Sequence, residues 1–381
     1  NLSDSPVIAT SSPVIASEAR QSNNPSIGVF STYNTKCGIA IYTKNLISSF
    51  ADKTVIFANY TQETTAMDNP NIVRCWHSGR DTSDIEALKR AIVSKNITTL
   101  IIQYNFSFIP LYLLEELLFF CDLNSIDVHL FFHSTKDVIT AEYIDSLGSI
   151  SGSLDKTTAI YVHSVEDLNY LKHFGIYKNT FLIVHPFNAA LMDMSKHIQK
   201  VPSDFVTLAT FGFLLPQKGV LELIDVAEEL DKEGIKVKLL LLCAVHPAPV
   251  SQILKKHIEE KISLSPIKNR IEICFDFLPE EQIVARLSAA DKIVFAYQNT
   301  QESSSAALRI GLLSQKEIIA TPQPIFNDAK HTVTFSSDSS VASLVKTIKK
   351  SLSSEFDPTK QIEWILKNDI KTVSQRFFNS L

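Results

Sequence analysis

The stretch ATFGFLLPQKGVLELIDVAEEL, residues 209–230, passes from an apolar run through a short loop into a helical pattern. One face of the helical part carries apolar side chains at helical spacing: Val220, Leu223, Ile224, Ala227 and Leu230. This spacing predicts a helix that buries that face. An apolar strand that leads directly into a buried helix is typical of a doubly wound parallel sheet. The stretch therefore predicts the α/β fold class.

The same alternation extends in both directions. The earlier runs are SIGVF, TVIFA, TLIIQY, DVHLFFH, AIYVH and FLIVH, and those after residue 201 are VTLATFG, KVKLLLLCA, IEICF, KIVFAY, EIIAT and TVTF. Helical patterns separate these runs, including one over residues 137–147. We expect two Rossmann-like domains, at residues 25–200 and 201–355, each a parallel sheet covered by helices on both faces. Ligands bind at the carboxyl ends of such strands, so domains that face one another would form a cleft.

The two ends of the chain differ from this pattern. Residues 1–24 contain the unit SPVIA twice among Ser, Asn and Pro. A repeat fold needs about three copies, so we predict a disordered leader there. At the other end, residues 361–381 place Trp364, Ile370 and Phe377 at roughly helical spacing. This spacing predicts one amphipathic helix that needs a surface to pack against.

Composition excludes several classes of protein. The net charge is −5 and no clustered basic run occurs, which argues against a nucleic-acid binder. The five cysteines are widely spaced and include no CxxC pair, which argues against a structural zinc site. Several of them lie in apolar runs, where a reduced, buried thiol is expected, and this favours a cytoplasmic location. The longest apolar candidate, IPLYLLEELLFFCDL, is interrupted by Glu115 and Glu116, whereas a membrane span needs about 20 apolar residues. We therefore predict no transmembrane segment.

A glycine stands between a predicted strand and a predicted helix in STYNTKCGIAIYTKNL, residues 31–46. The free backbone N–H groups at such a helix start suit a phosphate, and Gly38 would let the ligand approach because it has no Cβ. The alternative is a glycine required for packing.

Charged and small polar residues occur at two helix starts of the second predicted domain. Lys218 lies just before a helix, where its charge opposes the helix dipole unless an anion binds there. The alternative is a solvated surface lysine. Glu302 follows the run KIVFAY and precedes Ser303, Ser304 and Ser305. This position favours a ligand contact, but ordinary helix capping explains the serines equally well.

Three predicted strands of the first domain end in histidine. His133 ends DVHLFFH, His163 ends AIYVH and His185 ends FLIVH. A single histidine is more often structural than functional, but the carboxyl end of a strand is where ligands bind in this fold class. By position alone, the three histidines are equal candidates for the site.

Several pieces, taken in this order, resemble the GT-B glycosyltransferases and especially glycosyltransferase family 4. They are CGIAIYTKNL, FFHST, VHSVEDLNYLKHFG, HPF, FGFLLPQKGVLELI and ESSSAALRIGLLSQKEIIATPQPIF, and they span residues 26–325. The resemblance implies two Rossmann-like domains around a central cleft, with a nucleotide-sugar donor on the second domain and the acceptor on the first. It also implies a C-terminal helix, residues 356–381, that packs back on the first domain. Transfer would proceed with retention and without a metal or another cofactor.

The resemblance also implies roles for single residues. His133 matches the histidine that touches the donor sugar, and Lys218 matches the lysine that neutralises the diphosphate. Glu302 matches the first glutamate of an E-x7-E motif, which holds sugar hydroxyls. Gly38 matches the glycine loop near the donor phosphates. The stretch of the family whose backbone amides face the sugar and the phosphate corresponds here to Ser303, Ser304 and Ser305.

Two positions depart from the family pattern. Phe213 stands where the family usually has an arginine that binds phosphate, and Ile310 stands where it has the second glutamate, which binds ribose. Arg309 stands next to Ile310 in the sequence and could supply a charge in place of the missing one, but on a helix its side chain points about 100° away from that of Ile310. The resemblance thus implies a cytoplasmic glycosyltransferase that acts on a glycan or a lipid-linked acceptor, with peripheral membrane contact in the second case. The alternative is a catalytically silent GT-B domain that binds a sugar or a partner protein. A dinucleotide-binding enzyme is disfavoured because no GxGxxG follows the first strand of either domain.

Overall fold

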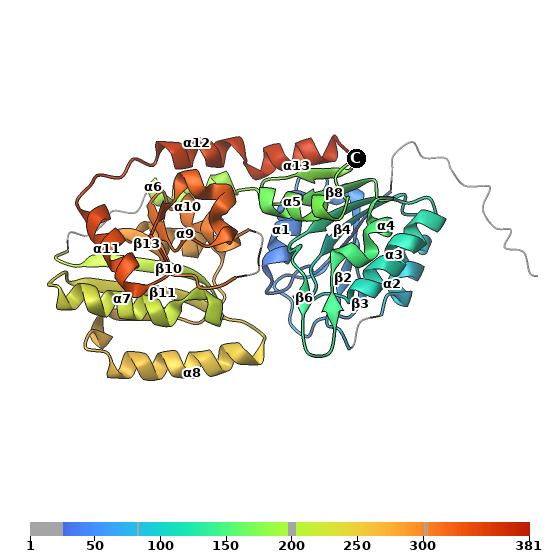
Figure 1. Ribbon diagram of the computed structural model, residues 1–381. Coiled ribbons are helices and arrows are strands. Elements are labelled where there is room, and N and C mark those ends of the chain that lie inside the picture. The colour runs from blue at the N-terminus through green and yellow to red at the C-terminus, as the bar shows by residue number, and fades with distance from the viewer. Residues whose placement is uncertain (1–25, 82–83, 197–202, 301, 303) are drawn as a thin grey trace, which may run out of the picture.

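The apolar runs of the sequence form the strands of two parallel sheets in the computed structural model (Figure 1). The structure describes residues 26–81, 84–196, 203–300, 302 and 304–381. The predicted leader, residues 1–24, and the predicted boundary between residues 200 and 201 lie outside these ranges.

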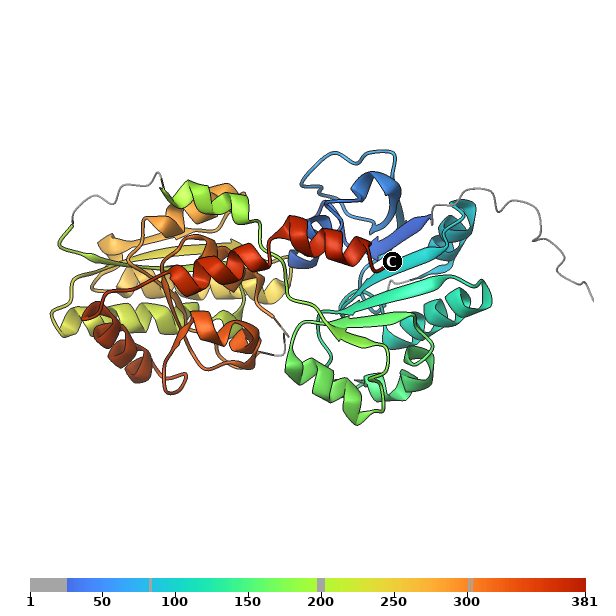
Figure 2. The ribbon, with the colours of Figure 1, turned by 90° about the horizontal axis from the view of Figure 1, so that it is seen from above.

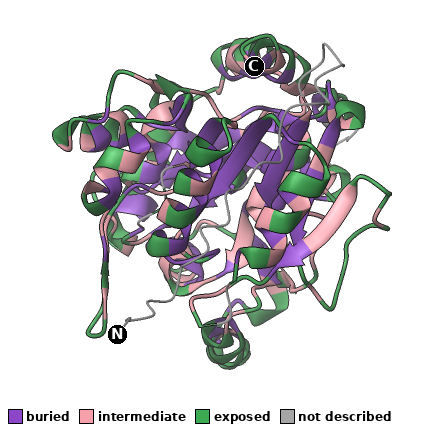
Figure 3. Cartoon of the chain, turned by 90° about the vertical axis from the view of Figure 1, so that its right-hand side faces the viewer, coloured by how far each residue is buried: buried purple, intermediate pink, exposed green. Residues whose placement is uncertain are grey.

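The first sheet has the strand order β3-β2-β1-β4-β5-β8-β9, with every pairing parallel among the described residues. Its strands are β1 (Ile27–Ser31), β2 (Thr54–Asn59), β3 (Ile72–Trp76), β4 (Thr99–Tyr104), β5 (Asp127–Phe132), β8 (Ala159–Val162) and β9 (Thr180–Leu182). The helices of this part are α1 (Gly38–Leu46), α2 (Glu86–Ser94), α3 (Leu111–Leu123), α4 (Ser151–Leu154) and α5 (Val165–His173). Every residue of β1 and β4 is buried, because helices cover both faces of the sheet (Figure 3).

The second sheet has the order β12-β11-β10-β13-β14-β15, and its pairings are also parallel. Its strands are β10 (Val206–Leu214), β11 (Val237–Val245), β12 (Ile271–Cys274), β13 (Lys292–Phe295), β14 (Glu317–Ala320) and β15 (Thr334–Phe335). The helices are α6 (Met192–Lys196), α7 (Val220–Lys232), α8 (Pro249–Leu264), α9 (Glu280–Ser288), α10 (Ala306–Leu313) and α11 (Val341–Leu352). We call each sheet with its helices a domain.

The chain crosses back to the first domain at its C-terminus (Figure 2). The predicted single helix over residues 361–381 is wrong, because the structure contains two helices, α12 (Thr359–Lys367) and α13 (Ile370–Phe378). Asp369 separates them: its side chain accepts a hydrogen bond from the Lys371 N–H and caps α13. The Ile370 N–H also donates to the Phe187 carbonyl, at 2.7 Å, which ties this break to the segment that joins the domains.

Helix α13 packs on one face of the first sheet. The Phe377 ring lies 5.1 Å from that of Phe131 and 5.4 Å from that of Tyr161, measured between centroids. The Ser374 and Ser49 hydroxyls are 2.7 Å apart, which links α13 to the segment after α1. The α13 half of the predicted stripe thus packs on the first domain, whereas Trp364 and Ile365 of α12 belong to the apolar core of the second domain.

The second wrong prediction concerns residues 137–147, which form no helix. They contain the antiparallel pair β6 (Val138–Ile139) and β7 (Ile144–Asp145). The Thr140 hydroxyl accepts from the Tyr143 N–H at 3.0 Å, and the Thr140 N–H donates to the Tyr143 carbonyl at 3.0 Å. A threonine that bonds the backbone in this way stabilises a turn rather than a helix.

Candidate active site

The two sheets share one topology, which fixes where each could bind a ligand. Strand order reverses between β1 and β4 in the first sheet and between β10 and β13 in the second. Loops that follow the strands on either side of such a switch point line the ligand site of doubly wound sheets. Gly38 follows β1, Lys218 follows β10 and Glu302 follows β13. These three predicted site residues therefore lie at the two switch points.

At the second switch point, Lys218 and Glu302 form an ion pair. The distance between Lys218 Nζ and Glu302 Oε2 is 2.9 Å. The loops that carry them are also joined through the backbone, since the Gln298 N–H donates to the Gln217 carbonyl at 2.8 Å. Two residues that are 84 positions apart in the sequence thus come together at the edge of the sheet.

Gly219 allows this close approach. Its φ angle is +67°, and a Cβ at this position would lie 1.8 Å from the Ala296 carbonyl oxygen. Only glycine fits a left-handed conformation against another backbone segment in this way. Gly219 is the N-cap of α7, so it sets Lys218 at the start of that helix. Sequence reasoning passed over Gly219, although a glycine at a strand-to-helix loop was the available signal.

Lys218 is not the solvated lysine of the alternative interpretation. Only 11% of its side chain is exposed, against 45% for Glu302. Its amine also lies 4.4 Å from the centre of the Tyr297 ring. Burial acts to lower the pKa of Lys218, but the nearby Tyr297 and Glu302 leave it above its ordinary value. Lys218 is therefore a buried cation whose counter-ion is Glu302.

Of the three serines before α10, Ser305 acts as a helix-capping residue. The Ser305 hydroxyl accepts from the Leu308 N–H at 3.1 Å, which makes it the N-cap of α10. The Ser304 hydroxyl donates to Asp328 Oδ2 at 3.2 Å. Ser303 lies outside the described residues. The capping interpretation therefore holds for the Ser305 side chain, and the proposed amide contacts with a sugar or phosphate stay predictions.

The two positions that depart from the family pattern have different surroundings. Phe213 is half-buried in a group of rings, with its centroid 5.2 Å from that of His246 and 5.8 Å from that of Phe277. Ile310 is 8% exposed and lies in the apolar core of the second domain. Its contact with a ribose stays a prediction. A carboxylate introduced there would be placed among apolar side chains.

Arg309 has a structural partner. It is 2% exposed and forms an ion pair with Asp328, which comes from the 3-10 helix Pro324–Thr332. Its guanidinium carbon lies 5.5 Å from the centre of the Trp364 ring on α12. Arg309 thus helps to join α10 to the C-terminal crossover.

In the first domain, His133 and Gly38 lie where the sequence predicts. The His133 N–H donates to the Tyr104 carbonyl at 3.1 Å, which fixes the residue at the end of β5. Its ring Nε2 lies 2.7 Å from Gln103 Oε1. With the Gln103 amide oriented so that Oε1 faces the ring, Nε2 donates to it and Nδ1 is the acceptor. At Gly38, a Cβ would meet no atom of the described residues within 4 Å, so the packing alternative finds no support in its surroundings.

His133, His163 and His185 surround one tyrosine that sequence reasoning missed. The Tyr42 ring centroid lies 4.9 Å from that of His133, 5.0 Å from that of His163 and 4.7 Å from that of His185. Burial lowers the pKa of all three imidazoles, and for His133 and His185 the pKa lies well below its ordinary value. We call these four residues the histidine cluster. Tyr42 follows Gly38 by one helical turn, and that spacing was the signal available.

Residues of the second domain lie close to the histidine cluster and to α5 of the first domain. The charges of Arg309 and Asp328 act on the pKa of His163. The Asn327 side chain donates to Glu166 Oε1 on α5 at 2.7 Å. The carboxyl edges of the two sheets are therefore neighbours.

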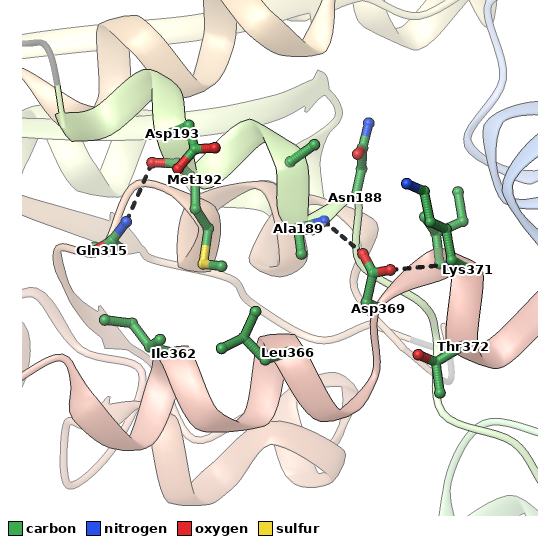
Figure 4. Close-up of a pocket in the computed structure, with 12 residues that line it drawn as sticks. Asn188, Ala189, Met192, Asp193, Gln315, Ile362, Leu366, Asp369, Lys371 and Thr372 are labelled. Atoms are coloured by element: carbon green, nitrogen blue, oxygen red, sulfur yellow. Dashed lines mark hydrogen bonds between the residues drawn. The ribbon is translucent and has the colours of Figure 1, made fainter.

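A separate pocket lies at the crossover (Figure 4). Its volume is about 530 Å³, and it is lined by Asn188, Ala189, Ala190, Met192, Asp193, Gln315, Ile362, Leu366, Asp369, Ile370, Lys371 and Thr372. None of the predicted site residues lines it. In the part of the chain that the structure describes, no cluster of three or more metal-ligating side chains could hold a metal ion. No described helix is long and apolar enough to cross a membrane.

The structure is similar to known sugar-transferring enzymes. Sucrose-phosphate synthase from Thermosynechococcus elongatus has a TM-score of 0.72 at 14% identity, covering 93% of this chain and 98% of that chain. HepE from Anabaena, in complex with UDP, has a TM-score of 0.69 at 12% identity, covering 93% and 99%. This chain has the GT-B fold. A third neighbour is the UDP-forming α,α-trehalose-phosphate synthase from Burkholderia xenovorans, with a TM-score of 0.69 at 9% identity, covering 93% and 98%.

These likenesses confirm the predicted fold class of two Rossmann-like domains that face one another. No family model matches the sequence, and no curated protein matches it either.

Proposed function

We propose that this protein is a glycosyltransferase that moves a sugar from a nucleotide-sugar donor to a glycan or a lipid-linked acceptor. The proposal includes transfer with retention and without a metal. It also includes a cytoplasmic location, in keeping with five free cysteine thiols. Contact with the inner face of a membrane would follow from a lipid-linked acceptor.

The observation that carries this proposal is the Lys218–Glu302 ion pair at the switch point of the second sheet. Breaking the anomeric bond leaves negative charge on the departing diphosphate. A buried lysine at a helix start would stabilise that charge without reorganisation, and one such donor is typically worth about 3 kcal/mol. In the absence of donor, the Glu302 carboxylate neutralises Lys218. When the donor binds, the diphosphate would take over that role and Glu302 would be free for sugar hydroxyls.

The first domain would supply uncharged contacts. The lowered pKa values keep the histidine cluster neutral near pH 7, and a neutral imidazole offers one acceptor and one donor nitrogen. His133 Nδ1 is such an acceptor for a hydroxyl group of the donor sugar. Gly38 would leave room for a phosphate at the start of α1.

A second candidate function is a silent GT-B domain that binds a sugar or a partner protein. Two observations favour it. Phe213 is packed among rings where the resembling family has a cation, and Ile310 is buried in the core where that family has a glutamate.

The experiment that tests the proposal is a thermal-shift screen of UDP-, GDP- and ADP-sugars, followed by a transfer assay with the sugar that binds. A ligand present at 100 times its dissociation constant should stabilise the protein by about 2.7 kcal/mol. Binding together with hydrolysis or transfer supports the enzyme. Binding without turnover favours the silent domain. If no nucleotide sugar or nucleoside diphosphate binds, the proposal is wrong.

A further inference from the structure

A histidine outside the predicted site lies at the same edge of the second sheet. His246 directly follows β11, whose last residue, Val245, pairs with Leu214 at the end of β10. Its ring meets that of Phe213 edge to face, with centroids 5.2 Å apart and an interplanar angle of 88°. Phe213 in turn stacks on Phe277, which follows β12, at 5.8 Å and 24°. The three rings come from three neighbouring strands.

Hydrogen bonds fix both the position and the proton of this histidine. The His246 N–H donates to Ser251 Oγ at 2.9 Å, and the Ser251 hydroxyl donates to the Leu214 carbonyl at 2.6 Å. The Ala248 N–H donates to His246 Nδ1 at 3.1 Å. Because Nδ1 accepts, the neutral ring carries its proton on Nε2. No described residue accepts a hydrogen bond from Nε2, so this donor is left for another group.

The charges of the predicted site residues Lys218 and Glu302 act on the pKa of the His246 ring. Burial lowers the pKa of His246, while Glu302 acts to raise it and Lys218 acts to lower it. Lys218, Glu302 and His246 follow the strands β10, β13 and β11, which are adjacent in the sheet. An anion placed against Lys218 would therefore lie near His246 as well.

We propose that His246 is a second ligand of the donor diphosphate and donates from Nε2 to an oxygen of its terminal phosphate. This inference rests on the proposed function, because it concerns the same donor site. Phe213 would be a positioning residue, since its ring holds the imidazole edge-on at the place where the resembling family has an arginine. With His246 held against Phe213 in this way, a chain that has phenylalanine at position 213 would still present two donors, Lys218 and His246, to one diphosphate.

The test compares nucleotides that differ by one phosphate. Wild type, His246→Ala and His246→Gln are titrated calorimetrically with UDP, GDP and ADP and with the corresponding monophosphates. Loss of a hydrogen bond to a charged group should weaken diphosphate binding by about tenfold in His246→Ala. Monophosphate binding should stay unchanged, because a monophosphate lacks the terminal phosphate that His246 would contact. His246→Gln retains an N–H donor near the Nε2 position and should recover part of the loss.

The matched control is His257→Ala. His257 is exposed on α8, the helix that follows the His246 loop, and its loss should change neither affinity. Nitrogen-15 NMR of the wild-type imidazoles adds a measurement that needs no variant. The His246 Nε2 signal should move on addition of the diphosphate, and the His257 signals should not.

The outcomes separate this inference from the proposed function. If wild type binds a diphosphate and His246→Ala binds it equally well, the inference is overturned while the proposed function stands. An equal loss for monophosphate and diphosphate also overturns it, since His246 would then contact the nucleoside or the first phosphate rather than the terminal one. An unmoved Nε2 signal overturns it even if a variant fails to fold. If wild type binds none of the diphosphates, both proposals are wrong.

Discussion

The two domains repeat one topology, but their carboxyl edges carry opposite chemistry. At the edge of the first sheet, Tyr42 is enclosed by three imidazoles whose pKa values are lowered by burial. At the edge of the second, the buried Lys218 amine pairs with a carboxylate and has a raised pKa. Burial alone disfavours any charge, so a charged group persists only where a partner compensates it. At the first edge, burial outweighs the nearby carboxylates Asp167 and Asp328, so the pKa of the imidazoles stays lowered and they remain neutral near pH 7.

This difference indicates which parts of one nucleotide-sugar donor each edge could contact. A diphosphate needs fixed positive charge, whereas hydroxyl groups need neutral donors and acceptors. The edge of the second sheet offers fixed positive charge, on Lys218. The edge of the first sheet offers neutral donors and acceptors, on the imidazoles. Each expected outcome below tests one side of this contrast.

The largest expected effect concerns the charged edge. Lys218→Ala should reduce sugar transfer at least a hundredfold, because Phe213 supplies no second cation beside the diphosphate. The fold should be retained, since the removed charge is balanced by a Glu302 side chain that is nearly half exposed. Single-turnover transfer and circular dichroism measure the two effects. Lys256→Ala, at an exposed position on α8, is the matched control and should transfer normally. Unchanged transfer in Lys218→Ala would remove Lys218 from the mechanism and favour the silent domain.

The second expected effect concerns the neutral edge and appears as a pH dependence of stability. The imidazoles of His133, His163 and His185 have lower pKa values in the folded chain than the ordinary 6.5. His129, inside β5, shares this property, with a pKa lowered to about 4 by burial. As the pH falls below 6.5, the unfolded chain binds protons that the folded chain does not. Stability should therefore fall from pH 6.5 downward, by up to about 1.4 kcal/mol per pH unit for each such imidazole.

Urea unfolding at pH 7 and pH 5 measures this loss. His163→Gln removes one of the titrating groups and should reduce the difference in unfolding free energy between the two pH values. His257→Gln, at an exposed position, should leave the difference as in wild type. An equal difference in wild type and His163→Gln would mean that His163 is not neutral in the folded protein.

The contrast between the edges also shows what a sequence alone can predict. The strands of both sheets were predictable, because continuous apolar runs of four to seven residues leave few other ways to be buried. Strand β3, IVRCW, escaped notice because its apolar run is interrupted by Arg74. Arg74 is satisfied by Asp68, six residues earlier, with Nε and Oδ2 2.6 Å apart, and the apolar pattern of the sequence does not show that this ion pair forms.

The positions of the candidate site residues in the fold were predictable, but their pairings were not. The sequence places Lys218, Glu302 and His133 at strand ends, which is sufficient to bring them to an edge. It does not reveal that Lys218 pairs with Glu302 or that three histidines surround Tyr42, because both arrangements depend on the order of the strands in each sheet. Ile310 illustrates the same limit. Helical spacing gives its direction from the axis but not whether apolar side chains or a ligand lie on that side.

The smallest expected effect concerns Gly38, at the start of α1, where the neutral edge would meet a phosphate. Gly38→Val should leave the unfolding midpoint nearly unchanged, because a Cβ meets no described atom within 4 Å and valine is no worse than glycine in a helix. Transfer should fall by no more than about fivefold, since an anion at a helix N-terminus gains about 0.3–1 kcal/mol. Gly152→Val, on α4 and also without a described neighbour within 4 Å, is the matched control and should transfer normally. Should Gly38→Val fail to fold, the glycine is required for packing after all. If it folds and transfers like the control, no ligand approaches α1 closely, and the phosphate contacts belong to the second domain alone.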